Sequence, residues 1–174
     1  MPIFYKYKIP KYNHVSRNLI KSLEFNRQTI RFKPKGLWFG IEKDWLKFLQ
    51  DELGYTIKVG RKYLYMPNNY YLYEVRFRKE KILKISSFED LEKFQKEFDI
   101  PSESADTPYN LINWPKVAEK YSGFMVSKNY EKIRKKAEKA TNREIYLWFS
   151  MLDGNTGCIW SPHYTRVIKK APVK

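Results

Sequence analysis

Cysteine, histidine and acidic residues are scarce in this sequence, and long apolar runs are missing. Its 174 residues include one cysteine, Cys158, and two histidines. A single cysteine excludes an intramolecular disulfide and a cysteine-cluster zinc site, so no metal is expected, and disulfide-free chains are typical of reducing compartments. Lysines interrupt the apolar runs near the amino terminus, which indicates neither a signal peptide nor a membrane span. The sequence therefore predicts a soluble cytoplasmic protein.

The charge balance is strongly basic. Lys and Arg number 34 against 19 Asp and Glu, a net charge of +15, and residues 1–35 hold nine of the basic residues and one Glu. A positive field of this kind favours anionic partners, and nucleic acid is the commonest of them. Lysine-rich composition also follows genome-wide preference, so charge alone names no function.

The chain has the length and the apolar content of one folded domain. Hydrophobic residues make up 43% and aromatic residues 17% of it, which excludes a disordered chain. A chain of this length buries one sizeable core more readily than two. We therefore expect a single domain over residues 1–174.

Hydrophobic periodicity and turn residues predict alternating strands and short helices. Strands are expected at 3–9, 11–16, 28–32, 36–40, 123–127, 157–160 and 165–170, with a hairpin over 68–85 that turns at 79–81. Helices are expected at 16–23, 41–54, 86–98 (with Ser86 and Glu89 as a capping box), 113–121 and 129–140. Residues 99–112 look like a loop insertion, and 143–152 fit either helix or strand. The order of elements predicts an α+β fold with a mainly antiparallel, strongly curved or split sheet.

Three fragments in order carry a resemblance: His14-Val15-Ser16, Lys35-Gly36-Leu37-Trp38-Phe39 and Gly157-Cys158-Ile159-Trp160. They resemble the ADP-ribosyltransferase superfamily, in its diphtheria-toxin and poly(ADP-ribose) polymerase branch, whose first strand carries His-x-Ser/Thr and whose second motif reads Gly-Lys-Gly-Ile-Tyr-Phe. The run of HVS, KPKGLWFG, INWPKVAEKYSGF and GCIWSP also resembles small bacterial and phage proteins that look like members. The resemblance implies the split, curved sheet with short flanking helices, and NAD as substrate.

The resemblance also assigns roles to residues of this chain. It implies that His14 and Ser16 hydrogen-bond ribose hydroxyls, that Gly36 pairs with the carboxamide and that Trp38 packs against nicotinamide. It also implies that Arg17, Lys33 and Lys35 neutralise the diphosphate and that Leu37 belongs to the NAD site.

The third motif departs from the family pattern. The family places a glutamate at the start of a late strand, whereas this chain reads Asp153-Gly-Asn-Thr-Gly-Cys there. Asp153 is the nearest carboxylate, with Glu144 a remoter substitute. The candidate catalytic residues are therefore His14, Trp38 and Asp153. Asn155 and Thr156 offer hydrogen bonds only. Either the carboxylate comes from another segment, or the domain binds NAD without transferring ADP-ribose.

Two other functions stay open. Lysines between 128 and 139, the basic first 35 residues and exposed tyrosines (Tyr5, Tyr7 and Tyr12) would together form a groove for single-stranded nucleic acid in a non-catalytic, viral type of protein. Alternatively, the chain is an interaction protein whose charge reflects its genome. Cys158 and Trp160 are expected to be buried, and His163 to be exposed. The leading interpretation is an NAD-binding ADP-ribosyltransferase-like protein acting on a macromolecule, with nucleic acid as the acceptor that the charge favours.

Overall fold

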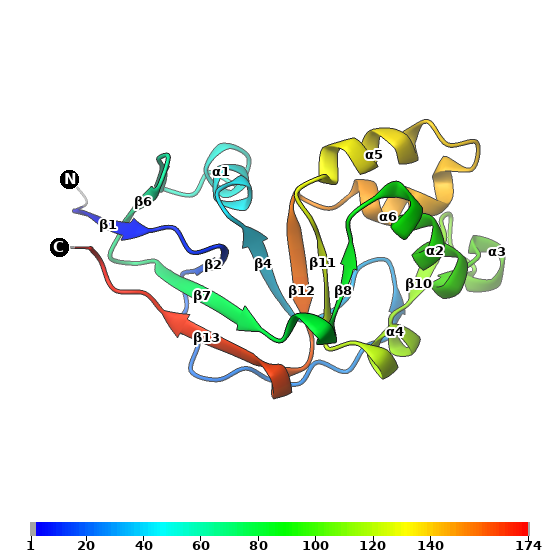
Figure 1. The fold of residues 1–174 in the computed structure, drawn as a ribbon, viewed down its shortest axis with the longest axis horizontal. Coiled ribbons are helices and arrows are strands. Elements are labelled where there is room, and N and C mark those ends of the chain that lie inside the picture. Colours follow the sequence, from blue (N-terminus) through cyan, green and yellow to red (C-terminus); the bar gives the residue numbers. More distant parts are fainter. Residues whose placement is uncertain (1–2, 174) are drawn as a thin grey trace.

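The structure, a computed structural model, describes residues 3–173 and has an α+β architecture built on a curved sheet of seven strands (Figure 1). In spatial order the strands are β13 (Thr165–Lys169), β7 (Tyr71–Phe77), β2 (Tyr12–Ser16), β4 (Leu37–Ile41), β12 (Thr156–Ile159), β11 (Gly123–Val126) and β8 (Ile82–Ile85). Neighbours pair antiparallel except β11 and β8, which are parallel. The expected curved, mainly antiparallel sheet is confirmed.

Two small sheets and several short helices flank the large sheet. One small sheet contains β1 (Phe4–Lys8), β6 (Tyr63–Pro67) and β5 (Lys58–Val59), and the other contains β3 (Ile30–Arg31), β10 (Leu111–Asn113) and β9 (Asp99–Ile100). The helices are α1 (Asp44–Asp51), α2 (Phe88–Phe98), α3 (Ser102–Ala105), α4 (Trp114–Lys120), α5 (Tyr130–Glu138) and α6 (Leu147–Ser150). The 3-10 turns are η1 (Lys79–Lys81), η2 (Arg143–Tyr146) and η3 (Pro162–Tyr164).

The core consists of three clusters on the two faces of the large sheet. Along β4, Phe39 and Ile41 belong to the cluster of the concave face, whereas Trp38 packs against the cluster beneath the helices. That second cluster is aromatic, with Trp114, Trp148 and other rings in edge-on or tilted contact. The third cluster joins α1 and the β1 sheet to β7 and β2. Because strand side chains alternate between faces, β4 contributes to two of the clusters at once.

Most elements lie where the periodicity predicts them, and four predictions are wrong, including the helix at 16–23. Residues 68–85 are not a hairpin, because β7 pairs with β2 and β13 while β8 pairs with β11. The capping box of α2 uses Ser87 and Asp90, one residue later than expected. Residues 99–112, expected as a loop, contain β9, α3 and the start of β10. Residues 143–152, for which helix and strand were both open, are helical and form η2 and α6.

The expected helix at 16–23 is also absent, because tertiary groups take its backbone amides. The Asn18 amide donates to the Ser16 hydroxyl at 3.0 Å, and the Ile20 amide donates to the Tyr73 hydroxyl at 2.8 Å. Residues 17–29 have no regular secondary structure and run beside the sheet. Hydrogen bonds from these amides to the Ser16 and Tyr73 hydroxyl oxygens thus replace the intrahelical ones that propensity favours.

Gly157 sets the distance between β12 and its neighbours. A Cβ added there would lie 2.4 Å from the Phe39 ring and 2.5 Å from the Phe124 backbone oxygen. We expect Gly157→Ala to lower the free energy of unfolding by roughly 1–3 kcal/mol, since the strand backbone cannot move aside. Urea denaturation measures this. Gly54→Asn is the control, because Gly54 is left-handed with open space around it and asparagine tolerates that conformation. Equal stability of both variants would contradict the prediction.

Candidate functional site

Three segments far apart in the sequence meet on adjacent strands. β2 carries His14 and Ser16, β4 carries Leu37 and Trp38, and β12 carries the Gly157–Ile159 segment. β4 lies between the other two strands, with Trp38 opposite Cys158 and Leu37 opposite Ile159. The fold therefore brings the three motif segments to one place.

The sheet is split between β2 and β4. Within the described residues the two strands pair only at Tyr12–Ile41 and Asn13–Gly40. β2 stays paired with β7 as far as Ser16, so it diverges from β4 after Asn13. The β2-facing edge of β4 near Trp38 consequently has no strand partner in residues 3–173. A strand edge of this kind presents backbone donors and acceptors to a ligand.

The His14 imidazole bridges this split. Its Nδ1–H donates to the Trp38 carbonyl oxygen at 2.7 Å, which leaves Nε2 with a free lone pair. Burial lowers the pKa of His14, and the hydrogen bond to the Trp38 carbonyl opposes the shift more weakly. The neutral imidazole is therefore favoured at pH 7, with Nε2 as a hydrogen-bond acceptor.

The imidazole and the Trp38 indole lie on opposite faces of the sheet. His14 is 6.3 Å from Tyr73, ring centre to ring centre. The indole is edge-on to Phe124 at 5.9 Å within the helix-covered cluster, and the Lys33 ammonium lies 6.0 Å from it. The two rings do not face each other, so these two side chains do not form the shared NAD contact that the resemblance implies for them.

A hollow of about 250 Å³ lies at the amino end of β4, and neither His14 nor Trp38 is among its lining residues. Its lining includes Gly36, Leu37, Ile159, Ser161 and residues between 20 and 26. Gly36 has a φ of 153° and a Cβ there would lie 2.2 Å from the Ile159 carbonyl oxygen, so β12 itself makes a close approach at this glycine. The same glycine borders the hollow.

Glu24 is a site residue that sequence reasoning missed. Its exposed side chain lines the same hollow as Gly36 and Leu37. The signal was present, since Glu24 is the only acidic residue among the first 35. It went unused because the expected helix at 16–23 gave no reason to bring residue 24 to the sheet.

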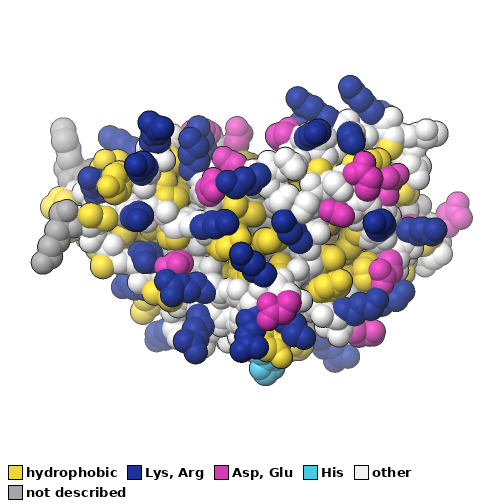
Figure 2. All heavy atoms as spheres, viewed as in Figure 1, with side chains coloured by type: hydrophobic (Ala, Val, Ile, Leu, Met, Phe, Trp, Pro, Cys, Tyr) yellow, Lys and Arg dark blue, Asp and Glu magenta, His cyan; other side chains and the backbone are white. Residues whose placement is uncertain are grey.

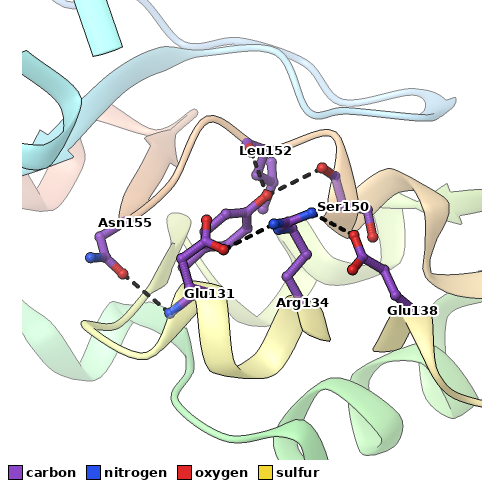
Figure 3. Close-up of polar contacts among 7 residues, drawn as sticks. Glu131, Arg134, Glu138, Ser150, Leu152 and Asn155 are labelled. Atoms are coloured by element: carbon purple, nitrogen blue, oxygen red, sulfur yellow. Dashed lines mark hydrogen bonds and ion pairs between the residues drawn. The ribbon is translucent and has the colours of Figure 1, made fainter. Parts of the chain in front are cut away.

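Asp153 lies in the loop that leads from α6 to β12 at the other end of β4. There the Ile41 amide donates to the Asn155 carbonyl oxygen at 3.0 Å. α5 fixes this loop, as Figure 3 shows: the Tyr130 hydroxyl donates to the Leu152 carbonyl oxygen at 2.6 Å, and the Tyr130 amide donates to the Asn155 side chain at 3.3 Å. Burial raises the pKa of Tyr130 to about 12, so the hydroxyl stays a donor. Glu144 is exposed in η2.

The three cations expected at a diphosphate do not gather at the hollow. Arg17 donates to the Tyr70 hydroxyl at 2.9 Å and lies over the Tyr55 ring. Lys33 donates to the Met151 carbonyl oxygen. Lys35 is exposed, and Gln28 holds its backbone through two hydrogen bonds of 2.8 and 3.0 Å. Lys35 is therefore the cation best placed next to Gly36.

One part of the groove expected from exposed tyrosines and the basic helix is wrong, because Tyr7 is buried. β1 lies at the left of Figure 1, and α5 lies in its right half. On α5, Arg134 pairs with Glu131 and Glu138, which neutralises part of that surface. The alternative of a basic nucleic-acid surface needs another location.

Three smaller predictions are confirmed. Cys158 is buried and its thiol pKa is raised by burial, as expected of an inert thiol. Trp160 is buried, and His163 is exposed.

Comparisons of the chain with protein-family models, curated proteins and solved structures find no match in any of the three. Across residues 3–173, no helix has the length and apolarity needed to cross a membrane. In the same residues, no group of three or more His, Cys, Asp or Glu side chains is arranged to hold a metal ion. The ADP-ribosyltransferase resemblance therefore stays a prediction.

The lowered pKa of His14 predicts a specific pH dependence of stability. As the pH falls below about 6.5, the unfolded chain takes up a proton at His14 more readily than the folded one. The stabilisation from neutral His14 is complete above that pH and is lost toward the lower, folded-state pKa. We expect His14→Gln to reduce the fall in Tm between pH 7.5 and pH 5. His163→Gln, at the exposed histidine, should leave the fall unchanged, and an equal effect of both variants would overturn the assignment.

Proposed function

We propose that the protein binds NAD at the split between β2 and β4 and transfers ADP-ribose to a macromolecular acceptor, as an ADP-ribosyltransferase-like protein. One observation carries the proposal: the three motif segments lie on adjacent strands, and the sheet opens beside Gly36 and Trp38. A chance likeness of short motifs gives no reason for the three segments to meet.

The groups along the split suit the two polar parts of a nicotinamide riboside. A primary carboxamide has one acceptor oxygen and two N–H donors, so it pairs with an unpaired strand edge much as an added strand does. The edge of β4 near Trp38 has no strand partner within residues 3–173, and its Trp38 carbonyl already accepts a hydrogen bond from His14. Ribose hydroxyls donate hydrogen bonds, and His14 Nε2 accepts them in the tautomer fixed by the Trp38 carbonyl.

The chemistry requires a carboxylate, and Glu24 is the candidate that the hollow supports. In the transfer, the bond between ribose C1 and the nicotinamide nitrogen breaks, its electron pair leaves with nicotinamide, and a nucleophile of the acceptor bonds to C1. Positive charge develops on the ribose in between, as in glycoside cleavage, and a nearby carboxylate stabilises it. Glu24 lines the same hollow as Gly36 and Leu37, whereas Asp153 lies beyond the other end of β4. We therefore place Glu24 before Asp153 in this role.

Calorimetric titration with NAD tests the binding step. We expect saturable binding by the wild type, at least tenfold weaker binding by His14→Ala because the acceptor at Nε2 is lost, and no change in His163→Ala. No saturable binding by the folded wild type at millimolar NAD would overturn the proposal. So would equal affinity of the two histidine variants.

Release of nicotinamide from bound NAD tests the transfer step. We expect Glu24→Gln to bind NAD within about twofold of the wild type and to release nicotinamide at least 100-fold more slowly, since a carboxylate facing developing charge is worth several kcal/mol. Glu52→Gln, on an exposed residue at the end of α1, is the control. Binding without any release by the wild type would show a domain that binds NAD and does not transfer ADP-ribose.

A further inference from the structure

A second hollow, of about 310 Å³, lies at the opposite end of β4 from Glu24. Its lining contains lysines from four separate segments: Lys11, Lys79, Lys84 and Lys128. The spacing of strand residues puts the two ends of β4 on the order of 13 Å apart. The second hollow is therefore distinct from the proposed NAD site.

The positive charge of this hollow is only partly neutralised. Lys128 pairs with Glu42 at 2.6 Å, and the Lys11 ammonium lies 5.5 Å from the Tyr12 ring. Neither Lys79 nor Lys84 forms an ion pair within residues 3–173. Lysines that converge on a concave surface repel one another and raise the local concentration of anions.

The floor of the hollow is apolar. Tyr12, Ile41 and Met125 form it, and all three belong to the cluster of the concave face or pack against it. Figure 2 shows Lys and Arg side chains around an apolar area in the middle of the face in view. An apolar floor within a basic rim suits a ligand that has flat, weakly polar rings as well as negative charge.

The basic surface continues beyond this hollow. A neighbouring hollow of about 540 Å³ shares Lys11 and adds Lys8, Lys43, Arg61 and Lys62, with Glu42 between them. A ligand with one phosphate would use one hollow, whereas a polymer with a phosphate on every unit can follow both.

We propose that these two hollows bind single-stranded nucleic acid, with the phosphates on the lysines and base faces on the apolar floor. In a duplex the base faces are stacked on each other and cannot reach such a floor, whereas unpaired bases can. An acidic peptide would satisfy the lysines but not the floor. The inference does not depend on the proposed NAD site. It assigns a binding role to the lysine-rich surface around the two hollows.

Fluorescence anisotropy with a labelled 15-nucleotide oligo(dT) tests the proposal. The variant Lys79→Gln/Lys84→Gln removes the two unpaired lysines, and Lys93→Gln/Lys96→Gln removes two exposed lysines of α2 as a matched control of equal net charge. We expect the first variant to bind at least tenfold more weakly and to lower the salt slope of log Kd by about 1.4, at about 0.7 per lost phosphate contact on a single strand. The control should bind within twofold of the wild type.

Equal weakening in both variants would overturn the proposal, because binding would then follow net charge alone. A duplex or poly-glutamate that binds as tightly as oligo(dT) would overturn it too. Should the double variant fail to fold by circular dichroism, Lys84→Gln alone should still weaken binding, and Lys79→Arg/Lys84→Arg should preserve it. His14→Ala should leave oligonucleotide affinity unchanged, so failure at one hollow is distinguishable from failure at the other.

Discussion

The unequal pairing of β4 is the constraint on which the rest of the structure depends. This strand pairs with β12 at four positions and with β2 at two. The sheet is continuous on one side of β4 and opens on the other, so it bends into two halves around a concave face. The His14 imidazole occupies the opening and hydrogen-bonds the Trp38 carbonyl, a group that a continuous sheet would use for its ladder.

Close packing of backbones keeps β4 and β12 in register. Gly36 lies against the Ile159 carbonyl, and Gly157 lies against Phe39 and the Phe124 carbonyl. Any side chain at these glycines would push the strands apart. The aromatic cluster beneath the helices then supports this half of the sheet, so the hollow beside Gly36 has a rigid wall on the β12 side and a wall of irregular chain on the other. In the proposed NAD site, the ligand would therefore enter from the side of residues 20–26, where the wall is irregular chain.

Local sequence patterns predicted the individual helices and strands well, but they predicted poorly which strands pair and which distant groups a segment contacts. Strands such as β4 and helices such as α4 follow from periodicity and from Pro115 at a helix start, which are local properties. The hairpin at 68–85 failed because pairing of β7 and β8 depends on distant strands. The helix at 16–23 failed because the Tyr73 hydroxyl, 53 residues away, takes the amide of Ile20. The motifs pointed to Gly36 and Leu37, which line the hollow, whereas Glu24 could be placed there only once the path of its loop was known.

The two ends of β4 also differ in charge, and the two proposed sites lie at these two ends. Near Gly36 the lining of the hollow includes one carboxylate, Glu24, and no Lys or Arg, and both Arg17 and Lys33 hydrogen-bond other groups. At the Ile41 end four lysines meet with one glutamate among them. A negative group stabilises a cation that develops on a sugar. The basic end attracts phosphates and would destabilise such a cation. Separation along the strand keeps these opposed electrostatic requirements apart, since exposed charges beyond about 10 Å are largely screened.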